Sequence, residues 1–243
     1  MDRPALDRFL ARLAVRPSTP AVANPYAGSS AAAERRRHNL ARYLDRLVQV
    51  PAPIAIIGEA PGYRGCAVTG IPFTSRRVLA EVWPRWPPLA SLACELSVDE
   101  ASPWSEPTAS VLWRHLTPLL DAPPLLWNAF PFHPHPPGDA SANRRPGRAE
   151  LAEGAPYLRE LIDLFQPRLI MALGRVAQQQ LAGLGAGLPC VLALRHPAQG
   201  GAAQFAAGLQ AARAIIQPPE IGNHTLDEGR MANDERPGRH PAA

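Results

Sequence analysis

Three polar side chains of different chemistry stand at comparable points along this chain. Glu59, Asn128 and His196 each lie within two residues of the end of a short apolar run. A carboxylate can accept a proton or stabilise positive charge, an amide both donates and accepts hydrogen bonds, and an imidazole can do either at neutral pH. Such groups, brought together, could bind a polar substrate and assist a bond cleavage.

The elements that must position these side chains follow from the apolar pattern. Near-continuous apolar runs of this length are typical of strands buried on both faces of a sheet. The runs are Ile54–Ile57, Leu125–Trp127, Leu169–Leu173 and Val191–Leu194.

Helical periodicity fills the segments between and around these runs. The predicted helices are residues 4–15 and 33–49, followed by Ser75–Trp83, Pro107–Leu120, Arg148–Phe165, Arg175–Leu184 and Ala202–Ile216. Strands that alternate with helices indicate right-handed βαβ units. We therefore expect an α/β fold, a three-layer α/β/α sandwich with a central four-stranded parallel sheet. Ligands bind at the carboxyl ends of the strands in such sheets, which is where Glu59, Asn128 and His196 fall.

Length and composition favour one domain. The chain has 243 residues, of which 46% are hydrophobic, enough for one sizeable core. We expect a single domain over residues 1–216, with N-terminal helices in 4–49 and an α/β core in 53–216. Residues 217–243 lack periodicity and are predicted to be a disordered tail.

Charge and cysteine content limit the possible partners. The formal net charge is +4 and the isoelectric point is near 9.4, which fits either attraction to a polyanion such as DNA or a compositional preference for arginine. We expect the arginines of residues 33–49 to form a solvated helix face rather than a DNA contact. Three dispersed cysteines and the lack of an apolar stretch of about 20 residues predict a soluble cytoplasmic protein.

Four motifs, taken in order, resemble the uracil-DNA glycosylase superfamily over roughly residues 53–200. They are Gly58-Glu59-Ala60-Pro61-Gly62, Gly70-Ile71-Pro72-Phe73, Asn128 and His196-Pro197. The first is the GEAPG form of the family 4 branch. The resemblance implies a monofunctional DNA repair glycosylase that hydrolyses the N-glycosidic bond of flipped-out uracil and leaves an abasic site.

The resemblance also implies a role for each motif residue. Phe73 would form an aromatic wall of the uracil pocket, and the Asn128 amide would accept from uracil N3–H and donate to O4. His196 would donate to uracil O2, helped by N–H groups of the GEAPG turn, while Glu59 would orient or activate the attacking water. We name Glu59 and His196 as catalytic candidates. The substrate-binding candidates are Gly58, Ala60, Gly62, Tyr63, Phe73 and Asn128.

Several positions depart from the family patterns. The best-known branch has an aspartate where this chain has Ala60, so the acidic role falls to Glu59. Its thymine-excluding tyrosine is replaced by Gly62, with Tyr63 displaced by one residue, so thymine must be rejected by other means. The second acid of family 4 is replaced by Gly65-Cys66, and the serine after His-Pro is Ala198. Asp99, Glu100 and Glu106 lie in what reads as a less structured insertion, so Glu59 remains the preferred acid.

No cofactor is expected. Family 4 enzymes hold an iron–sulfur cluster with four cysteines, and three dispersed cysteines cannot supply that set. The Arg-rich loop Asn143-Arg144-Arg145-Pro146 lacks the histidine with which related proteins trap DNA covalently. The segment from His133 to Pro137 could suggest a metal site, but a proline-stiffened loop beside the pocket is the preferred interpretation.

Uracil-containing DNA is the expected partner of a monomeric protein. Arginines and backbone close to the site would contact the phosphates. The DNA-binding candidates are Arg144, Arg145, Arg195, Gln199 and Gly200. Two alternatives stay open, namely a binder that does not cleave or that retains its product, and a nucleotide-binding α/β protein unrelated to repair.

Overall fold

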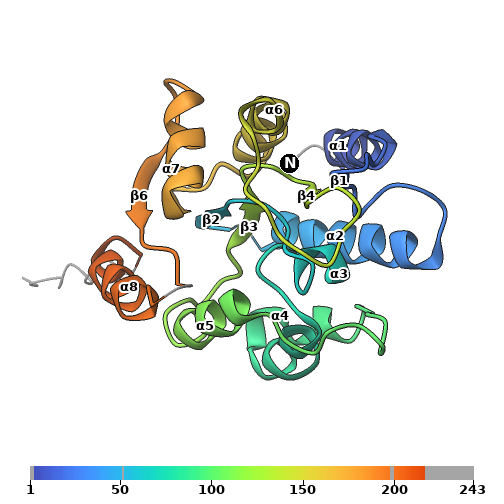
Figure 1. Cartoon of the computed structure of the whole chain (residues 1–243). Coiled ribbons are helices and arrows are strands. Elements are labelled where there is room, and N and C mark those ends of the chain that lie inside the picture. Colours follow the sequence, from blue (N-terminus) through green and yellow to red (C-terminus); the bar gives the residue numbers. More distant parts are fainter. Residues whose placement is uncertain (1–2, 51, 198–199, 217–243) are drawn as a thin grey trace, which may run out of the picture.

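The computed structural model describes residues 3–50, 52–197 and 200–216 (Figure 1). Its helical elements are α1 Arg3–Val15, α2 Ala31–Gln49, α3 Cys66–Thr69, the π-helix η1 Val78–Val82, the 3-10 helix η2 Trp83–Arg85, α4 Pro87–Ala93, α5 Pro107–Leu116, α6 Arg148–Phe165, α7 Gly174–Gly183 and α8 Ala202–Ile216. Its strands are β1 Val22–Ala23, β2 Ile54–Gly58, β3 Leu125–Asn128, β4 His133–Pro134, β5 Leu169–Leu173 and β6 Cys190–Leu194. The predicted tail, residues 217–243, lies outside the described residues.

The central sheet has four parallel strands in the order β3-β2-β5-β6, as the apolar runs predicted. Strands β2 and β5 are buried over their whole length, because they lie in the middle of the sheet and are covered on both faces. Strand β6 is an edge strand whose first residues are exposed, which its apolar sequence did not reveal. The register aligns Gly58 with Asn128 at the carboxyl ends of β2 and β3.

Helices cover the sheet on both sides and complete three layers (Figure 1). Helix α7 packs against β2, β5 and β6, and α6 packs against β3. Figure 1 shows α5 and α8 on the opposite side of the sheet, where α8 contacts β6 and α5. The predicted α/β/α sandwich is therefore confirmed. Among the described residues, no helix has the length and apolarity needed to cross a membrane.

The connection between β2 and β3 differs from the predicted helix over Ser75–Trp83. The chain instead forms η1 and η2 in succession, followed by α4, which was not predicted. Prolines interrupt regular helical hydrogen bonding here, since Pro84 falls within η2 and α4 begins with Pro87. The aromatic side chains of this connection still pack into the core, with Trp83 stacked on Tyr43 at a centroid distance of 5.6 Å.

A second, two-stranded sheet was also not predicted. Strand β1 pairs antiparallel with β4, with Ala23 opposite His133. Strands of two residues carry no periodicity, and this pair joins segments more than a hundred residues apart in the sequence. The pairing fixes the segment after β3 against the N-terminal part of the chain.

The arginines of α2 are less solvated than predicted. Arg36 Nε donates to the carbonyl oxygen of Pro25, and Arg37 donates to those of Tyr26 and Gly28. Arg42 forms an ion pair with Glu95. These side chains bind neighbouring segments. Sequence periodicity cannot distinguish arginines with such partners from arginines on a solvated helix face.

Candidate active site

A cleft of about 600 Å³ opens at the carboxyl ends of the parallel strands. That volume lies within the range of small-molecule sites. All four strands of the central sheet contribute to its walls, either directly or through the residues that follow them. The polar and aromatic lining residues are Glu59, Phe73, Thr74, Glu106, Thr108, Asn128, Asn143, Arg144, Arg145, Arg175, Gln178, Arg195 and His196.

Glu59 is the first residue after β2 and lines this cleft. Partial burial raises the pKa of its carboxyl above the ordinary value, and the positive charge of Arg145 opposes that rise. A half-buried carboxylate is poorly hydrated, which makes it a better proton acceptor than one in bulk water. The predicted position of Glu59 at the strand edge is therefore matched by an environment suited to base chemistry.

Phe73 reaches the cleft from an unusual backbone conformation. Its φ of 56° lies in the left-handed region, which phenylalanine rarely adopts. A residue of helix α5 stabilises this conformation, because Trp113 Nε1 donates a 2.8 Å hydrogen bond to the Phe73 carbonyl oxygen. The following residue, Thr74, is fully buried and hydrogen-bonds Thr69. The Phe73 ring is thus fixed as an aromatic wall.

Asn128 ends β3 beside Gly58 and is only 4% exposed. A β-carbon on residue 58 would lie 2.8 Å from Asn128 Oδ1 and 2.5 Å from Phe73 Cζ, so Gly58 leaves room for both side chains. None of the described residues hydrogen-bonds the Asn128 side-chain amide. A nearly buried amide that lines a cleft without such a partner is well suited to a ligand with its own donor and acceptor.

His196 lies two residues after β6 and lines the cleft. Strands β3 and β6 are the two edge strands of the central sheet, so Asn128 and His196 come from opposite edges. Its ring packs against Gly174, where the backbone φ is +80° and a β-carbon would lie 3.4 Å from His196 Cβ. Burial lowers the pKa of His196, Glu106 raises it and Arg195 lowers it. The imidazole is therefore neutral at physiological pH, and a neutral ring can still donate one hydrogen bond.

Glu106 is a cleft residue that sequence reasoning missed. The insertion that contains it was read as less structured, but Glu106 caps α5 by accepting from Thr108 N at 2.9 Å and from Ala109 N at 2.5 Å. It also faces His196 closely enough to raise the pKa of that ring. A proline at the first position of a helical pattern is a recognisable helix-start signal, and it could have located the capping residue directly before it.

The arginine-rich loop of residues 139–147 contains two arginines, Arg144 and Arg145, with different surroundings. Arg144 pairs with both carboxylate oxygens of Glu150 and donates to the carbonyl oxygens of His135 and Ala21. Its guanidinium therefore holds the loop in place, although it also lines the cleft. Arg145 is exposed at the cleft and acts electrostatically on Glu59.

Asn143 joins the same loop to the GEAPG turn. Its Oδ1 accepts a 3.1 Å hydrogen bond from Tyr63 N, and its side chain lies beside Gly62. Among the predicted substrate-binding residues, Ala60, Gly62, Phe73 and Asn128 line the cleft. Gly58 and Tyr63 are outside that lining, with Gly58 beneath Phe73 and the Tyr63 ring near Arg64.

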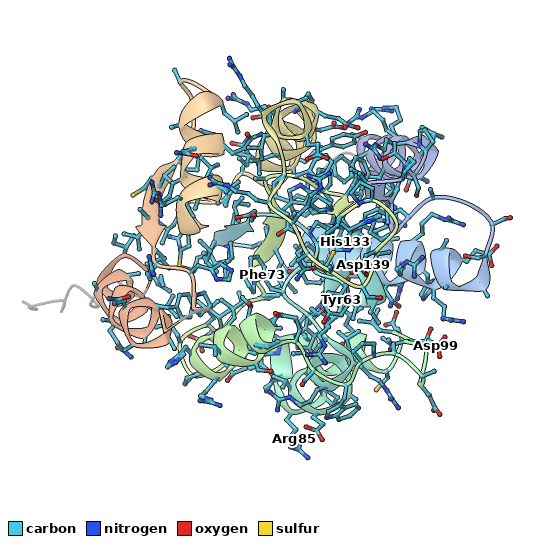
Figure 2. All side chains as sticks on the ribbon, in the orientation of Figure 1. Tyr63, Phe73, Arg85, Asp99, His133 and Asp139 are labelled. Carbon is cyan, nitrogen blue, oxygen red and sulfur yellow. The ribbon has the colours of Figure 1, made fainter. Side chains whose placement is uncertain are left out.

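The predicted DNA-binding residues divide in a similar way. Arg144, Arg145 and Arg195 line the cleft, whereas Gly200 is exposed outside its lining. Gln199 lies outside the described residues, as does Ala198. Figure 2 shows Asp99 at the periphery of the molecule and Phe73 near its centre, which agrees with the exclusion of Asp99 from the site.

The cysteines do not assemble a cluster site. Cys66 is buried with its Sγ 3.7 Å from Tyr26 Oη, whereas Cys94 and Cys190 are exposed. No group of three or more His, Cys, Asp or Glu side chains in the described part of the chain could hold a metal ion. His133 and His135 stack at a centroid distance of 5.4 Å, and each ring contacts backbone carbonyls instead. The residues present therefore do not fit a four-cysteine iron–sulfur cluster.

The comparison with protein families agrees with the motifs. A family model described as the uracil DNA glycosylase superfamily matches residues 46–217, more than half of the chain. Among solved structures, the wild-type UNG from Nitratifractor salsuginis is 14% identical with a TM-score of 0.38, over 89% of this chain and 98% of that one. No curated protein matches the chain.

Proposed function

Because the chain belongs to the uracil DNA glycosylase superfamily, we propose that it hydrolyses the N-glycosidic bond of uracil flipped out of DNA. The products are free uracil and an abasic site. One observation carries the proposal: a carboxylate, an aromatic ring, a side-chain amide and a neutral imidazole line a single cleft. The family match and this set of groups, each after a strand end or in a fixed turn, support the same chemistry.

In this proposal, uracil enters the cleft as a flat ring against Phe73. The Asn128 Oδ1 accepts from uracil N3–H, and its Nδ2 donates to O4. Cytosine presents an acceptor at N3 and a donor at N4, so the same amide orientation disfavours it. Discrimination against cytosine therefore depends on the Asn128 amide keeping this orientation, with Oδ1 toward uracil N3–H.

Cleavage breaks the bond between C1′ of the sugar and N1 of uracil. The bonding pair leaves with the base, so negative charge accumulates on the uracil ring, including O2, and positive charge on the sugar. His196 donates a hydrogen bond to O2 in its neutral form, which stabilises the anion without transferring a proton. Glu59 stabilises the cationic sugar and accepts a proton from the water whose oxygen bonds to C1′. That proton is then available to the uracil anion through solvent.

The DNA backbone is bound by basic groups around the cleft. Arg145 and Arg195 are exposed residues of the cleft lining, and the net charge of the chain is +4. Phosphate contacts of this kind orient the duplex without reading its sequence. We further propose that the protein acts as a cytoplasmic monomer, requires no metal cluster, and cleaves only the glycosidic bond.

Release of uracil from a labelled oligonucleotide tests the proposal. The protein is incubated with single- and double-stranded oligonucleotides that contain one uracil, and free base and abasic sites are measured separately. Thymine and cytosine oligonucleotides of the same sequence are the controls. We expect uracil release with multiple turnovers. Tight binding to the uracil oligonucleotide without any release would overturn the enzyme assignment in favour of a non-catalytic binder.

A further inference from the structure

His133 is a buried residue outside the cleft whose ring lies between two backbone carbonyls. It belongs to β4 and is 2% exposed. Its Nδ1 lies 2.7 Å from the carbonyl oxygen of Pro61, in the GEAPG turn, and its Nε2 lies 3.2 Å from that of Ala140, in the 139–147 loop. In Figure 2, His133 and Tyr63 are labelled in the same part of the view. The ring therefore connects two segments that form walls of the cleft.

The ring can donate to only one of these carbonyls while it is neutral. Burial lowers the pKa of His133, the two carbonyls raise it, and the charges of His135 and Arg144 lower it. We assign the single proton to Nδ1 because that contact is the shorter of the two. The imidazole then donates to Pro61.

The Pro61 carbonyl belongs to the same peptide unit as the Gly62 N–H. The described residues contain no cis peptide bond, so this C=O and N–H point in opposite directions. The carbonyl is directed to His133, which does not line the cleft, while Gly62 does line it. No described residue accepts a hydrogen bond from Gly62 N, although Gly62 O accepts from Gly65 N and Ala67 N. Proline has no N–H, so Gly62 supplies the next donor of the turn after Ala60.

We propose that His133 is a positioning residue that holds the Pro61–Gly62 peptide so that the Gly62 N–H donates to the negative charge developing on uracil O2. The inference rests on the proposed glycosylase function and adds a residue to it. A fixed N–H aimed at a developing charge is effective because it needs no reorganisation during the reaction. Without the His133 bond, the peptide is free to rotate and the donor is lost for part of the time.

Two substitutions separate this role from simple packing. The amide nitrogen of an Asn side chain can reach the position of His Nδ1, whereas that of Gln reaches the position of Nε2. His133→Asn therefore keeps the donor to Pro61, whereas His133→Gln loses it and places its amide nitrogen toward Ala140. Both remove the ring from the core, so their losses of thermal stability should be similar.

We expect kcat for uracil release to fall about 10- to 100-fold in His133→Gln, with KM for the oligonucleotide nearly unchanged, and about threefold or less in His133→Asn. His135→Gln is the matched control, because this neighbouring histidine contacts the carbonyl of Pro136 and not the turn. Its kcat should equal that of the wild type. Equal loss of kcat in His133→Gln and His133→Asn would overturn the proposal.

A measurement on the unliganded protein keeps the two proposals distinguishable. Amide hydrogen exchange at Gly62, followed by NMR, should change in His133→Gln and stay near the wild-type rate in His133→Asn. If the wild type releases no uracil but this exchange pattern is found, the proposed glycosylase function is wrong, whereas the positioning of the Pro61–Gly62 peptide by His133 is supported. Unchanged Gly62 exchange in His133→Gln would overturn the role of His133 whatever the activity.

Discussion

The ring of Phe73 lies against the α-carbon of Gly58. A β-carbon added at residue 58 would be 2.5 Å from Phe73 Cζ, closer than two carbon atoms can approach without a shift of one group. The same added atom would meet Asn128 Oδ1 at 2.8 Å. The smallest residue at the end of β2 therefore determines how the aromatic wall and the amide of the candidate site are arranged.

Substitution of Gly58 by Ala should displace Phe73 or Asn128. We expect uracil release to fall by about 10- to 100-fold, because displacements of about 1 Å at a reacting group have effects of this size. The free energy of unfolding should fall by about 1–3 kcal/mol, as for other overpacked core positions. Single-turnover kinetics and thermal unfolding measure the two effects.

Gly183→Ala is the matched control for this change. Gly183 ends α7 and has no atom within 4 Å of an added β-carbon. Its alanine variant should retain full activity and be as stable as the wild type or slightly more so. Equal activity of the two alanine variants would show that Gly58 does not restrict the site.

Glu59→Gln should reduce uracil release far more than DNA binding. The glutamine keeps the size of the side chain but can neither accept a proton from water nor stabilise the cationic sugar. A loss of about 10²- to 10⁴-fold in kcat is expected for a general base. The Kd for uracil-containing DNA, measured by fluorescence anisotropy, should change little. Unchanged turnover would remove Glu59 from the mechanism.

The activity should depend on pH through Glu59. Burial raises the pKa of this carboxyl, and the reaction needs the ionised form, so kcat/KM should fall as the pH falls through that raised value. The acidic limb of the profile should therefore lie above the pH expected for an ordinary glutamate. Since the charge of Arg145 opposes the rise, Arg145→Gln should move the limb to still higher pH. If the acidic limb of the kcat/KM profile did not shift in Arg145→Gln, a group other than Glu59 would determine its position.

Asn128→Asp should weaken the preference for uracil. An ionised carboxylate accepts from N3–H but cannot donate to O4, so one of the two recognising hydrogen bonds is lost. The ratio of kcat/KM for uracil to that for cytosine, measured in the same sequence, should fall by at least about tenfold. Asn143→Asp is the comparison, because an acceptor for Tyr63 N–H remains and the selectivity should persist. Uracil selectivity that survived Asn128→Asp would refute the recognition role.

Arg145→Gln should weaken binding to DNA of any sequence. Arg145 is exposed in the cleft lining, and loss of one phosphate contact should reduce the slope of log K against log salt by about one. Arg85 is the control, since it is also exposed but lies at the edge of the molecule in Figure 2, away from Phe73. Arg85→Gln should leave the slope unchanged. Identical slopes for both variants would exclude a phosphate contact by Arg145.

The amino-acid sequence determined the sheet and the edge at which the site lies. Buried parallel strands leave a continuous apolar signal, and the strands β2, β3, β5 and β6 were located within one residue of their observed bounds. The carboxyl ends of parallel strands share one edge by topology, so the positions of Glu59, Asn128 and His196 could be deduced without coordinates.

Only the tertiary structure decided the contacts that complete the cleft. Glu106 reaches it through the cap of α5, Phe73 is held in a left-handed conformation by Trp113, and His133 bonds the Pro61 carbonyl from 72 positions along the chain. Arg144, grouped with Arg145 by sequence, instead bonds Glu150. Such contacts depend on the packing of distant segments, whereas periodicity records only which face of an element is apolar. For that physical reason the sequence could specify the edge of the site, and the folded chain alone could specify how its side chains are held.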